Sequence, residues 1–224
     1  SIDQSTREQV YSDVIIPDLT YAIDNLGERS EYPETELGRA TKGAARAMLA
    51  RAYLFIGDFD EVERLTLDII NSGEYQLESD LSLVFSVDGE HGPGSVFEIG
   101  ALPEGYEAGG NQYANRWGVR GNSPNLGWGF GRPTLDLISF YGDDDPRMQN
   151  SILFVGETVE GLFVGGDDST PDSLFVDGEL VEIETYNQKT FVPGPEPRFS
   201  FAHNRRLMRY ADVLLMAAEA LNEN

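Results

Sequence analysis

Cysteine is absent from the 224-residue sequence, which excludes disulfides, thiolate metal sites and a cysteine nucleophile. Histidine is scarce as well: His91 and His203 are the only two, and neither lies in a recognisable metal-binding or nucleophile motif. There is no G-x-S-x-G nucleophile elbow. The Asp143–Pro146 stretch does not fit an EF-hand, so we interpret it as a solvated turn in preference to a calcium site. We therefore expect no metal and no cofactor.

Basic residues are few. Lys and Arg together number 16 against 39 Asp and Glu, which gives a formal net charge of -23. Nucleic acid is excluded as a partner, because binding it requires Lys and Arg to neutralise phosphates. An anionic membrane surface is disfavoured for the same reason. Two interpretations of the acidic surface stay open: adaptation to high salt, which screens self-repulsion, and an ordinary acidic extracytoplasmic protein.

Long apolar runs are also missing. No stretch approaches the ~18 residues needed to cross a bilayer, and the sequence does not open with a basic region followed by an apolar one, as a signal peptide does. The hydrophobic fraction of 40% is nevertheless ordinary for a folded chain, so we expect a buried core.

The first third of the chain is predicted to be helical. Ser5 to Leu26 carries apolar residues mostly three or four positions apart, with Thr6 as the cap and Pro17 as a kink. A second helix begins at Thr41 and ends at Gly57, and a third follows at once and ends at Ser72-Gly73. So short a connection makes the last two an antiparallel helix pair, close in length to a tetratricopeptide unit of ~34 residues.

The middle of the chain has a different character. Gly100 to Arg132 is rich in Gly, Asn and aromatic residues and has neither helical nor strand periodicity, which predicts a long irregular loop. A short helix is expected at Pro133–Tyr141. Short strands are expected at Val96–Ile99, Ser151–Val155, Leu162–Val164 and Val181–Tyr186.

A final helix is expected from about Asn204 to the end of the chain. Its apolar face is predicted to comprise Leu207, Tyr210, Ala211, Leu214, Ala217, Ala218 and Leu221. No later helix in the sequence is available to cover that face, so we expect an exposed stripe and a natural protein that continues past residue 224.

Three separated stretches carry a resemblance to a known family. Residues 39–57 read RATKGAARAMLARAYLFIG and are followed by an Asp-Phe turn and by INSGEYQL at residues 70–77. Residues 127–147 contain GWGFGRPTLDLISFY and GDDDPR, and residues 206–223 read RLMRYADVLLMAAEALNE. Together, and in this order, they resemble the SusD/RagB family of outer-membrane nutrient-binding lipoproteins.

The resemblance implies a mainly α fold in which tetratricopeptide-like helix pairs are combined with a long irregular loop region and a few short strands. The chain looks like the interior of one such domain. Residues 1–78 would form a helical scaffold, 79–203 a loop-rich ligand-side insertion and 204–224 a scaffold helix. Family members carry a lipid-anchoring cysteine, which this sequence lacks, so a surface-exposed position at the outer membrane is implied by the family alone.

The implied function is non-catalytic. It consists of binding oligosaccharide at the cell surface and delivering it to a SusC-like TonB-dependent transporter. Peptide cargo, as in RagB-like relatives, is an open alternative. A glycoside hydrolase that uses two carboxylates is a weaker alternative, because surface charge explains the excess of acidic residues. A tetratricopeptide-type adaptor is also weaker, because the middle third of the chain does not continue the repeated helix pairs.

The composition of residues 106–122 suits a sugar site, which needs flat apolar faces for pyranose rings and polar groups for hydroxyls. We expect stacking from Tyr106, Tyr113 and Trp117, and hydrogen bonds from Asn111, Asn115, Arg116 and Arg120. The alternative is that these aromatic residues pin a long loop onto the scaffold. Trp128 lies in the family's recurrent motif and is interpreted as structural.

Overall fold

A computed structural model of the chain describes residues 4–101, 112–121, 127–142, 144–167, 172–192 and 201–224. The chain divides into two compact units. The helical unit comprises residues 1–78, 91–99 and 206–224, and the loop-rich unit comprises residues 79–90 and 100–205. Residues 91–99, assigned in sequence to the ligand-side insertion, thus belong with the helical unit. The assignment of all these parts to one domain stays a prediction.

The N-terminal helix consists of three consecutive segments: α1 (Arg7–Val10), the π-helical η1 (Tyr11–Ile15) and α2 (Ile16–Asn25). Thr6 caps it as predicted, since its side-chain oxygen accepts a hydrogen bond from the Gln9 amide at 3.2 Å. A π-helical turn lies ahead of Pro17, and Pro17 sits in the first turn of α2, where its missing amide hydrogen costs little. Two 3-10 turns, η2 (Arg29–Glu31) and η3 (Glu34–Glu36), follow in the predicted loop.

The predicted helix pair is confirmed as α3 (Lys42–Ile56) and α4 (Phe59–Ser72). Thr41 caps α3 by accepting from the Ala44 amide at 3.1 Å, and Asp58 caps α4 by accepting from the Glu61 amide at 3.3 Å. Gly57 ends α3 in a left-handed conformation with φ of 79°, which a residue with a Cβ adopts only at a cost.

The C-terminal segment differs from its prediction. Residues expected to start the last helix form a strand, β8 (Arg205–Arg209), which pairs with β1 (Ser95–Ile99). The helix α8 (Tyr210–Glu223) begins after it. Its apolar face is covered in part, because α8 packs against α4, while Ala218 and Leu221 of the predicted stripe are exposed. The buried positions are also offset from the predicted stripe: they are Tyr210, Val213, Met216, Ala217 and Ala220.

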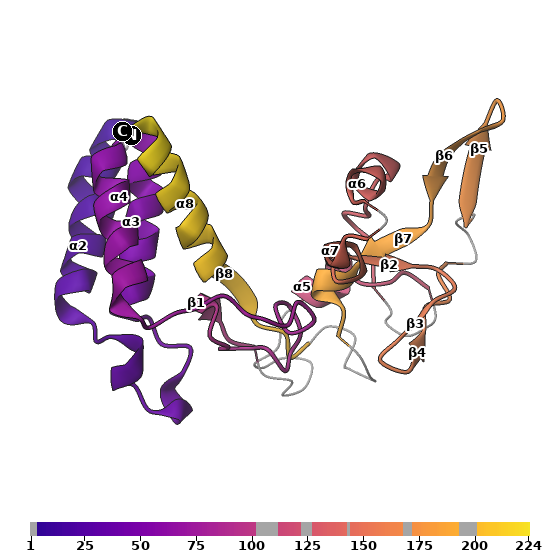
Figure 1. Ribbon diagram of the computed structural model, residues 1–224, viewed down its shortest axis with the longest axis horizontal. Coiled ribbons are helices and arrows are strands. Elements are labelled where there is room, and N and C mark those ends of the chain that lie inside the picture. The colour runs from indigo at the N-terminus through magenta and orange to yellow at the C-terminus, as the bar shows by residue number, and fades with distance from the viewer. Residues whose placement is uncertain (1–3, 102–111, 122–126, 143, 168–171, 193–200) are drawn as a thin grey trace. The chain divides into compact units, whose positions relative to one another are not determined.

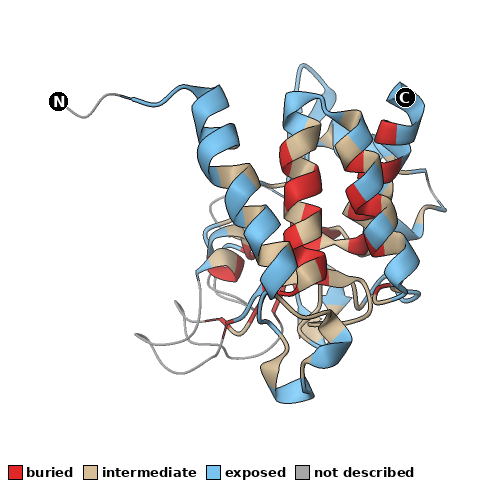
Figure 2. Cartoon of the chain, turned by 90° about the vertical axis from the view of Figure 1, so that its left-hand side faces the viewer, coloured by how far each residue is buried: buried red, intermediate tan, exposed pale blue. Residues whose placement is uncertain are grey.

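In the helical unit, α3 packs against α2 and α4, and α8 packs mainly against α4. Figure 1 shows the four helices together in one bundle. Figure 2 shows that the N-terminal helix is exposed or intermediate along its length, whereas buried residues run along the helices next to it. The core combines large residues of α4 and α8 with small ones of α3, and it also takes in Val96 of β1 and Met208 of β8. Alanines on α3 bring the helices close together, and Leu65 and Ile69 fill the volume between them.

The loop-rich unit is built from short elements. Its helices are α5 (Tyr113–Trp117), α6 (Leu135–Phe140), α7 (Pro146–Gln149) and the 3-10 turn η4 (Gln188–Thr190). Its strands are β2 (Ile152–Phe154), β3 (Thr158–Val159), β4 (Leu162–Phe163), β5 (Ser173–Val176), β6 (Glu179–Ile183) and β7 (Thr185–Asn187). The described strands pair two by two, as β2 with β7, β3 with β4 and β5 with β6.

Two of these pairs are tight hairpins. Glu160-Gly161 joins β3 to β4, and Asp177-Gly178 joins β5 to β6, with φ between 50° and 86° at all four residues. Positive φ at both central residues defines the type I′ turn that suits the twist of paired strands. The predicted strands at 151–155 and 162–164 are confirmed with shifted ends. The single strand predicted at 181–186 is divided between β6 and β7, which pair with β5 and β2. The elements β3, β5, α5 and α7 were not predicted.

The core of the loop-rich unit is small. Val119, Leu153, Val164, Tyr186 and Phe191 form its main cluster, and Ala114, Val192 and Phe201 form a second one. Among the described helices of the chain, none combines the length and the hydropathy needed to span a bilayer.

Candidate ligand-binding site

Within the loop-rich unit, α5 and the residues just after it run beside residues 127–130. The amides of Trp128 and Phe130 donate to the carbonyls of Asn115 and Arg116 at 2.9 and 3.0 Å. The Gly127 amide donates to the Val119 carbonyl at 2.8 Å, and Val119 is fully buried. The irregular segment 127–130 is thereby fixed to α5, to the residues just after it and to the core.

This pairing brings three aromatic side chains to one region. Trp128 and Phe130 are 49% and 52% exposed, and their rings meet edge to face with centroids 5.7 Å apart. Trp117 lies against Gly131, the residue after Phe130, so closely that a Cβ at Gly131 would overlap its six-membered ring. We call Trp117, Trp128 and Phe130 the aromatic platform. Half-exposed aromatic rings on a fixed backbone are suited to stacking on a flat apolar ligand surface.

Guanidinium groups lie on the same two chain segments that carry the aromatic platform, with Arg116 and Arg120 on the first and Arg132 on the second. Arg116 is exposed, and its side chain donates to Gln112 Oε1 at 3.4 Å. The Arg120 side chain is 58% exposed and lies 2.9 Å from Asp167 Oδ2, and Arg132 forms an ion pair with Glu182. A guanidinium whose charge is balanced by a neighbouring carboxylate still offers N–H donors to hydroxyl groups. The region therefore supplies both elements of a polyhydroxylated-ligand site.

Two of the predicted site residues are committed to holding the fold together. Asn115 is 1% exposed, so the prediction that its side chain contacts ligand is corrected: it is an interior residue of α5. The Tyr113 ring stacks on His203 at 6.4 Å, and the Arg205 guanidinium lies 5.6 Å from its centroid. These contacts favour the pinning interpretation for Tyr113.

The remaining predicted residues separate into two groups. Trp117, Arg116 and Arg120 are brought together by α5 and the bridge from Arg120 to Gly127. Tyr106 and Asn111 lie outside the residues that the structure describes.

Trp128 and Phe130 were missed as site residues. The interpretation of Trp128 as structural accounts for its hydrogen-bonded backbone, but not for an indole that is half exposed. The GWGFG sequence contains a usable signal. Trp128 and Phe130 are two residues apart, and in an extended segment such residues project to the same side, which would predict paired aromatic rings. The flanking glycines Gly129 and Gly131 have φ of 67° and 63°, so the segment is not a regular strand, and periodicity alone did not single it out.

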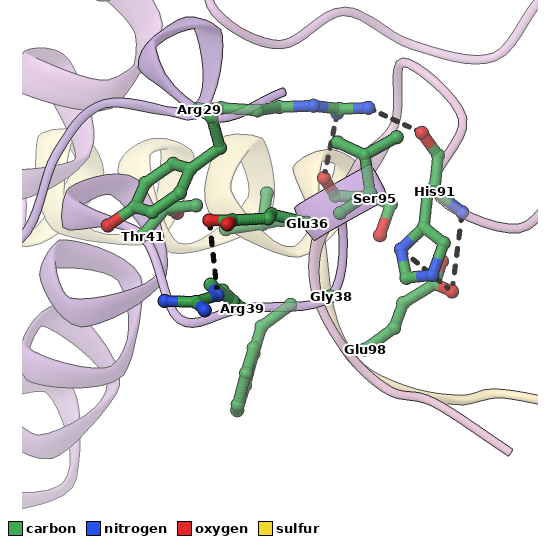
Figure 3. Close-up of a pocket in the computed structure, with 12 residues that line it drawn as sticks. Arg29, Glu36, Gly38, Arg39, Thr41, His91, Ser95 and Glu98 are labelled. Atoms are coloured by element: carbon green, nitrogen blue, oxygen red, sulfur yellow. Dashed lines mark hydrogen bonds and ion pairs between the residues drawn. The ribbon is translucent and has the colours of Figure 1, made fainter. Parts of the chain in front are cut away.

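A polar cavity in the helical unit, shown in Figure 3, is a weaker candidate. Its volume of about 30 Å³ holds only one or two water molecules. The Arg29 guanidinium donates hydrogen bonds to the carbonyls of Gly92 and Ser95, at 3.0 and 3.1 Å, and to the carbonyl of His91. The Glu98 side chain is 1% exposed and lies 3.5 Å from the buried guanidinium of Arg206. These groups hold the chain around β1 in place and leave little room for a ligand.

Comparison with known proteins decides the family. Residues 93–224, more than half of the chain, match the model of the SusD family. The chain belongs to the SusD family. It is 30% identical, over its whole length, to SusD-like protein P2 of Formosa agariphila, of which it covers 45%. The match to the family model contains the aromatic platform and the segments at 127–147 and 206–223 on which the resemblance rested.

Solved structures of SusD-like proteins share the fold. Surface glycan-binding protein A from Bacteroides thetaiotaomicron, in complex with laminarihexaose, superposes with a TM-score of 0.77 at 20% identity, over 99% of this chain and 51% of that one. A laminarin-binding SusD-like protein superposes with a TM-score of 0.76 at 22% identity and the same coverage. The chain thus spans about half the length of the SusD proteins it matches. The predicted fold class, mainly helical with tetratricopeptide-like pairs and a few short strands, is confirmed.

Proposed function

We propose that this SusD chain belongs to a non-catalytic protein that binds oligosaccharide at the aromatic platform. The single observation that supports this most is the pair of half-exposed rings, Trp128 and Phe130, held on a backbone that is hydrogen-bonded to α5. Exposed aromatic rings lose little conformational entropy on binding, since only two torsions are fixed, and they offer a large apolar face. Trp117 and Arg120 extend the same surface.

The relatives support a glycan as cargo. One structural neighbour is described as bound to laminarihexaose and another as laminarin-binding. The formal charge of -23 adds a preference, because a strongly acidic protein repels polyanionic polysaccharides. A neutral glycan is therefore the first ligand class to test, and laminarihexaose is the first compound.

The proposal extends to the setting of the protein. The helical unit serves as a scaffold and the loop-rich unit carries the ligand surface. Family membership supports a place at the cell surface, anchored to the outer membrane through a lipid, and delivery of the glycan to a SusC-like TonB-dependent transporter.

The test is binding of the intact protein to a glycan array and to laminarihexaose by calorimetry, at low and high salt. Trp128→Ala and Phe130→Ala are expected to weaken the affinity at least about tenfold each, because each removes a central aromatic contact. Phe140→Ala is the matched control: Phe140 is 82% exposed, lies on α6 and is outside the platform, so its loss is expected to leave affinity unchanged.

Three outcomes are informative. A glycan bound equally well by the platform variants and the wild type would place the site elsewhere. No glycan bound, with peptides retained in a platform-dependent way, would replace glycan by peptide as the cargo. Release of shorter sugars during a prolonged incubation would contradict the non-catalytic assignment.

A further inference from the structure

A second pocket lies in the loop-rich unit, lined by none of the platform residues. Its volume is about 560 Å³, within the range of about 300–1,000 Å³ typical of small-molecule sites. Its walls come from four parts of the sequence: residues 81–86, 149–154, 157–160 and 188–191. All four belong to the loop-rich unit. We call it the Phe85 pocket.

The lining combines apolar rings with neutral polar groups. Ile152 and Phe191 are 1% and 5% exposed and anchor the pocket in the interior, while Phe85 and Phe154 are half-buried. Around them lie hydroxyl and amide side chains, those of Ser82, Ser86, Gln149, Asn150, Thr158 and Gln188. A few polar groups around an apolar surface fix the orientation of a ligand that has both flat apolar faces and hydroxyls.

Gln188 is the one pocket-lining residue with an unsatisfied polar atom in the described part of the chain. Its Oε1 atom is buried and has no hydrogen-bond partner there. The backbone of Gln188 is fixed, because its amide donates to the Ser151 carbonyl at 3.1 Å and its carbonyl accepts from Phe191 at 3.1 Å. A buried amide oxygen without a donor is costly, and buried polar groups are nearly always paired. Because Oε1 is shielded from solvent, a ligand hydroxyl would pair with it only after the Gln188 side chain turns toward the pocket.

The charges around the pocket select against anionic ligands. The ionisable side chains that line it are Glu157 and Glu160, both acidic, and Glu157 Oε1 accepts from the Phe154 amide at 2.7 Å. The one cation recorded beside it, Lys189, does not line the pocket, and its ammonium lies 4.9 Å from the centroid of the Phe85 ring. Carboxylates accept hydrogen bonds from hydroxyls but repel sulfates, phosphates and uronates.

We propose that the Phe85 pocket is a second saccharide site, which takes one or two neutral sugar units independently of the aromatic platform. This inference rests on the proposed function for its ligand class. Both sites are anchored in one core: Phe191, which lines the pocket, packs in the same cluster as Val119, whose carbonyl fixes the platform segment. Two sites on one rigid support raise the retention of a long glycan through multivalency, even where each alone is weak.

The experiment titrates the intact protein with neutral gluco-, galacto-, manno- and xylo-configured disaccharides, read out by saturation-transfer NMR and calorimetry. Thr158→Trp fills the mouth of the pocket from the exposed strand β3 and is expected to abolish disaccharide binding. Gln188→Leu keeps the side-chain volume but removes the amide, and is expected to weaken binding at least about tenfold.

Two controls separate this inference from the proposed function. Ser173→Trp adds the same bulk at an exposed strand position outside the lining and is expected to change nothing. Trp128→Ala is expected to weaken the binding of long glycans, and any part of the disaccharide signal that it removes is assigned to the platform and not to the pocket. Circular dichroism establishes that each variant is folded.

The possible outcomes are distinct. Long-glycan binding that depends on Trp128, with no disaccharide bound or with binding unaffected by Thr158→Trp and Gln188→Leu, would overturn the second site and leave the proposed function intact. Disaccharide binding lost in both pocket variants, with no effect of platform variants on any glycan, would support the pocket and overturn the platform. Absence of binding to every sugar would overturn both.

Discussion

The helical unit satisfies most of its backbone hydrogen bonds locally, inside α2, α3, α4 and α8, and buries apolar faces of these helices against one another. The loop-rich unit has elements of two to six residues, and much of its backbone is paired by long-range contacts. Buried polar side chains follow this division. Of the nine found in the described residues, Thr41, Thr66 and Glu98 lie in the helical unit, and Asn115, Glu184, Thr185, Thr190, His203 and Asn204 lie in the loop-rich unit.

Residues 203 and 204 show what these polar groups do. The Asn204 side-chain Oδ1 accepts from the Ala101 backbone amide at 2.8 Å, and the Asn204 backbone amide donates to Glu90 Oε1 at 2.6 Å. His203 Nε2 is hydrogen-bonded to the Phe85 carbonyl at 2.9 Å. Irregular backbone that is buried has to find partners outside a helix or a sheet. Interior side chains provide them here, and they hold the segments of the loop-rich unit in irregular shapes that a helix could not offer.

The largest expected effect is on the helical unit. Leu65 is 1% exposed at the centre of its core, so Leu65→Ala is expected to reduce the free energy of unfolding by about 2–5 kcal/mol. Both tryptophans of the chain lie in the loop-rich unit, so tryptophan fluorescence follows that unit, while far-ultraviolet circular dichroism follows mainly the long helices. We expect the dichroism midpoint in urea to fall and the fluorescence midpoint to move much less.

Leu215→Ala is the control for this measurement. Leu215 lies on α8 and is 69% exposed, so its truncation is expected to change stability by less than about 0.5 kcal/mol. If Leu65→Ala shifts the dichroism and fluorescence midpoints equally, the two units unfold as one cooperative body and the contrast between them is structural only.

The same contrast explains what the sequence allowed us to predict. The boundaries of the α3–α4 pair were predicted, because Thr41, Gly57 and Gly73 act on residues within one turn of themselves. The last helix was placed too early, since the pairing of β8 with β1 joins residues more than a hundred positions apart and leaves no periodicity in either segment.

The residues of the candidate site, which stays a proposal, were only partly anticipated for a related reason. The composition of residues 106–122 singled out Trp117, Arg116 and Arg120, but composition does not report which side chains are buried, and Asn115 is interior. Trp128 and Phe130 join Trp117 only through hydrogen bonds between segments. The unpaired oxygen of Gln188 depends on the packing of η4 on β2, for which the sequence has no local signal.

A smaller loss of stability is expected when a glycine with positive φ is replaced by alanine, and each unit offers one such position. Gly57 has φ of 79° and open space around the position of a Cβ, so Gly57→Ala is expected to cost about 1–2 kcal/mol of backbone strain in the helical unit. Gly131 has φ of 63° and lies against the Trp117 ring, so Gly131→Ala adds a steric clash to the same strain and is expected to displace Trp117.

Tryptophan emission and glycan affinity are the measurements for this pair. Gly131→Ala is expected to shift the emission and weaken binding, whereas Gly57→Ala is expected to lower the dichroism midpoint and leave both unchanged. Unaltered emission in Gly131→Ala would show that Trp117 is not held by this contact.

The smallest effect concerns alkaline pH, where each unit contains a buried tyrosine. Burial, together with the hydrogen bond to Glu184, raises the pKa of Tyr186 in the loop-rich unit, and burial raises the pKa of Tyr75 in the helical unit. In the unfolded chain a tyrosine ionises near pH 10. Each neutral phenol therefore contributes stability that is complete below about pH 10 and is lost as the pH rises further; for Tyr186 the loss is about 1.4 kcal/mol at pH 11.

Phenylalanine variants separate the two contributions, because phenylalanine does not titrate. Tyr186→Phe is expected to flatten the decline of the fluorescence-detected stability between pH 10 and 11, and Tyr75→Phe to flatten the dichroism-detected one. Tyr186→Phe also removes the donor to the Glu184 carboxylate, so its stability at neutral pH falls, and the slope with pH is the informative quantity. A slope unchanged in Tyr186→Phe would mean that this phenol reaches solvent and ionises in the folded protein as readily as in the unfolded one.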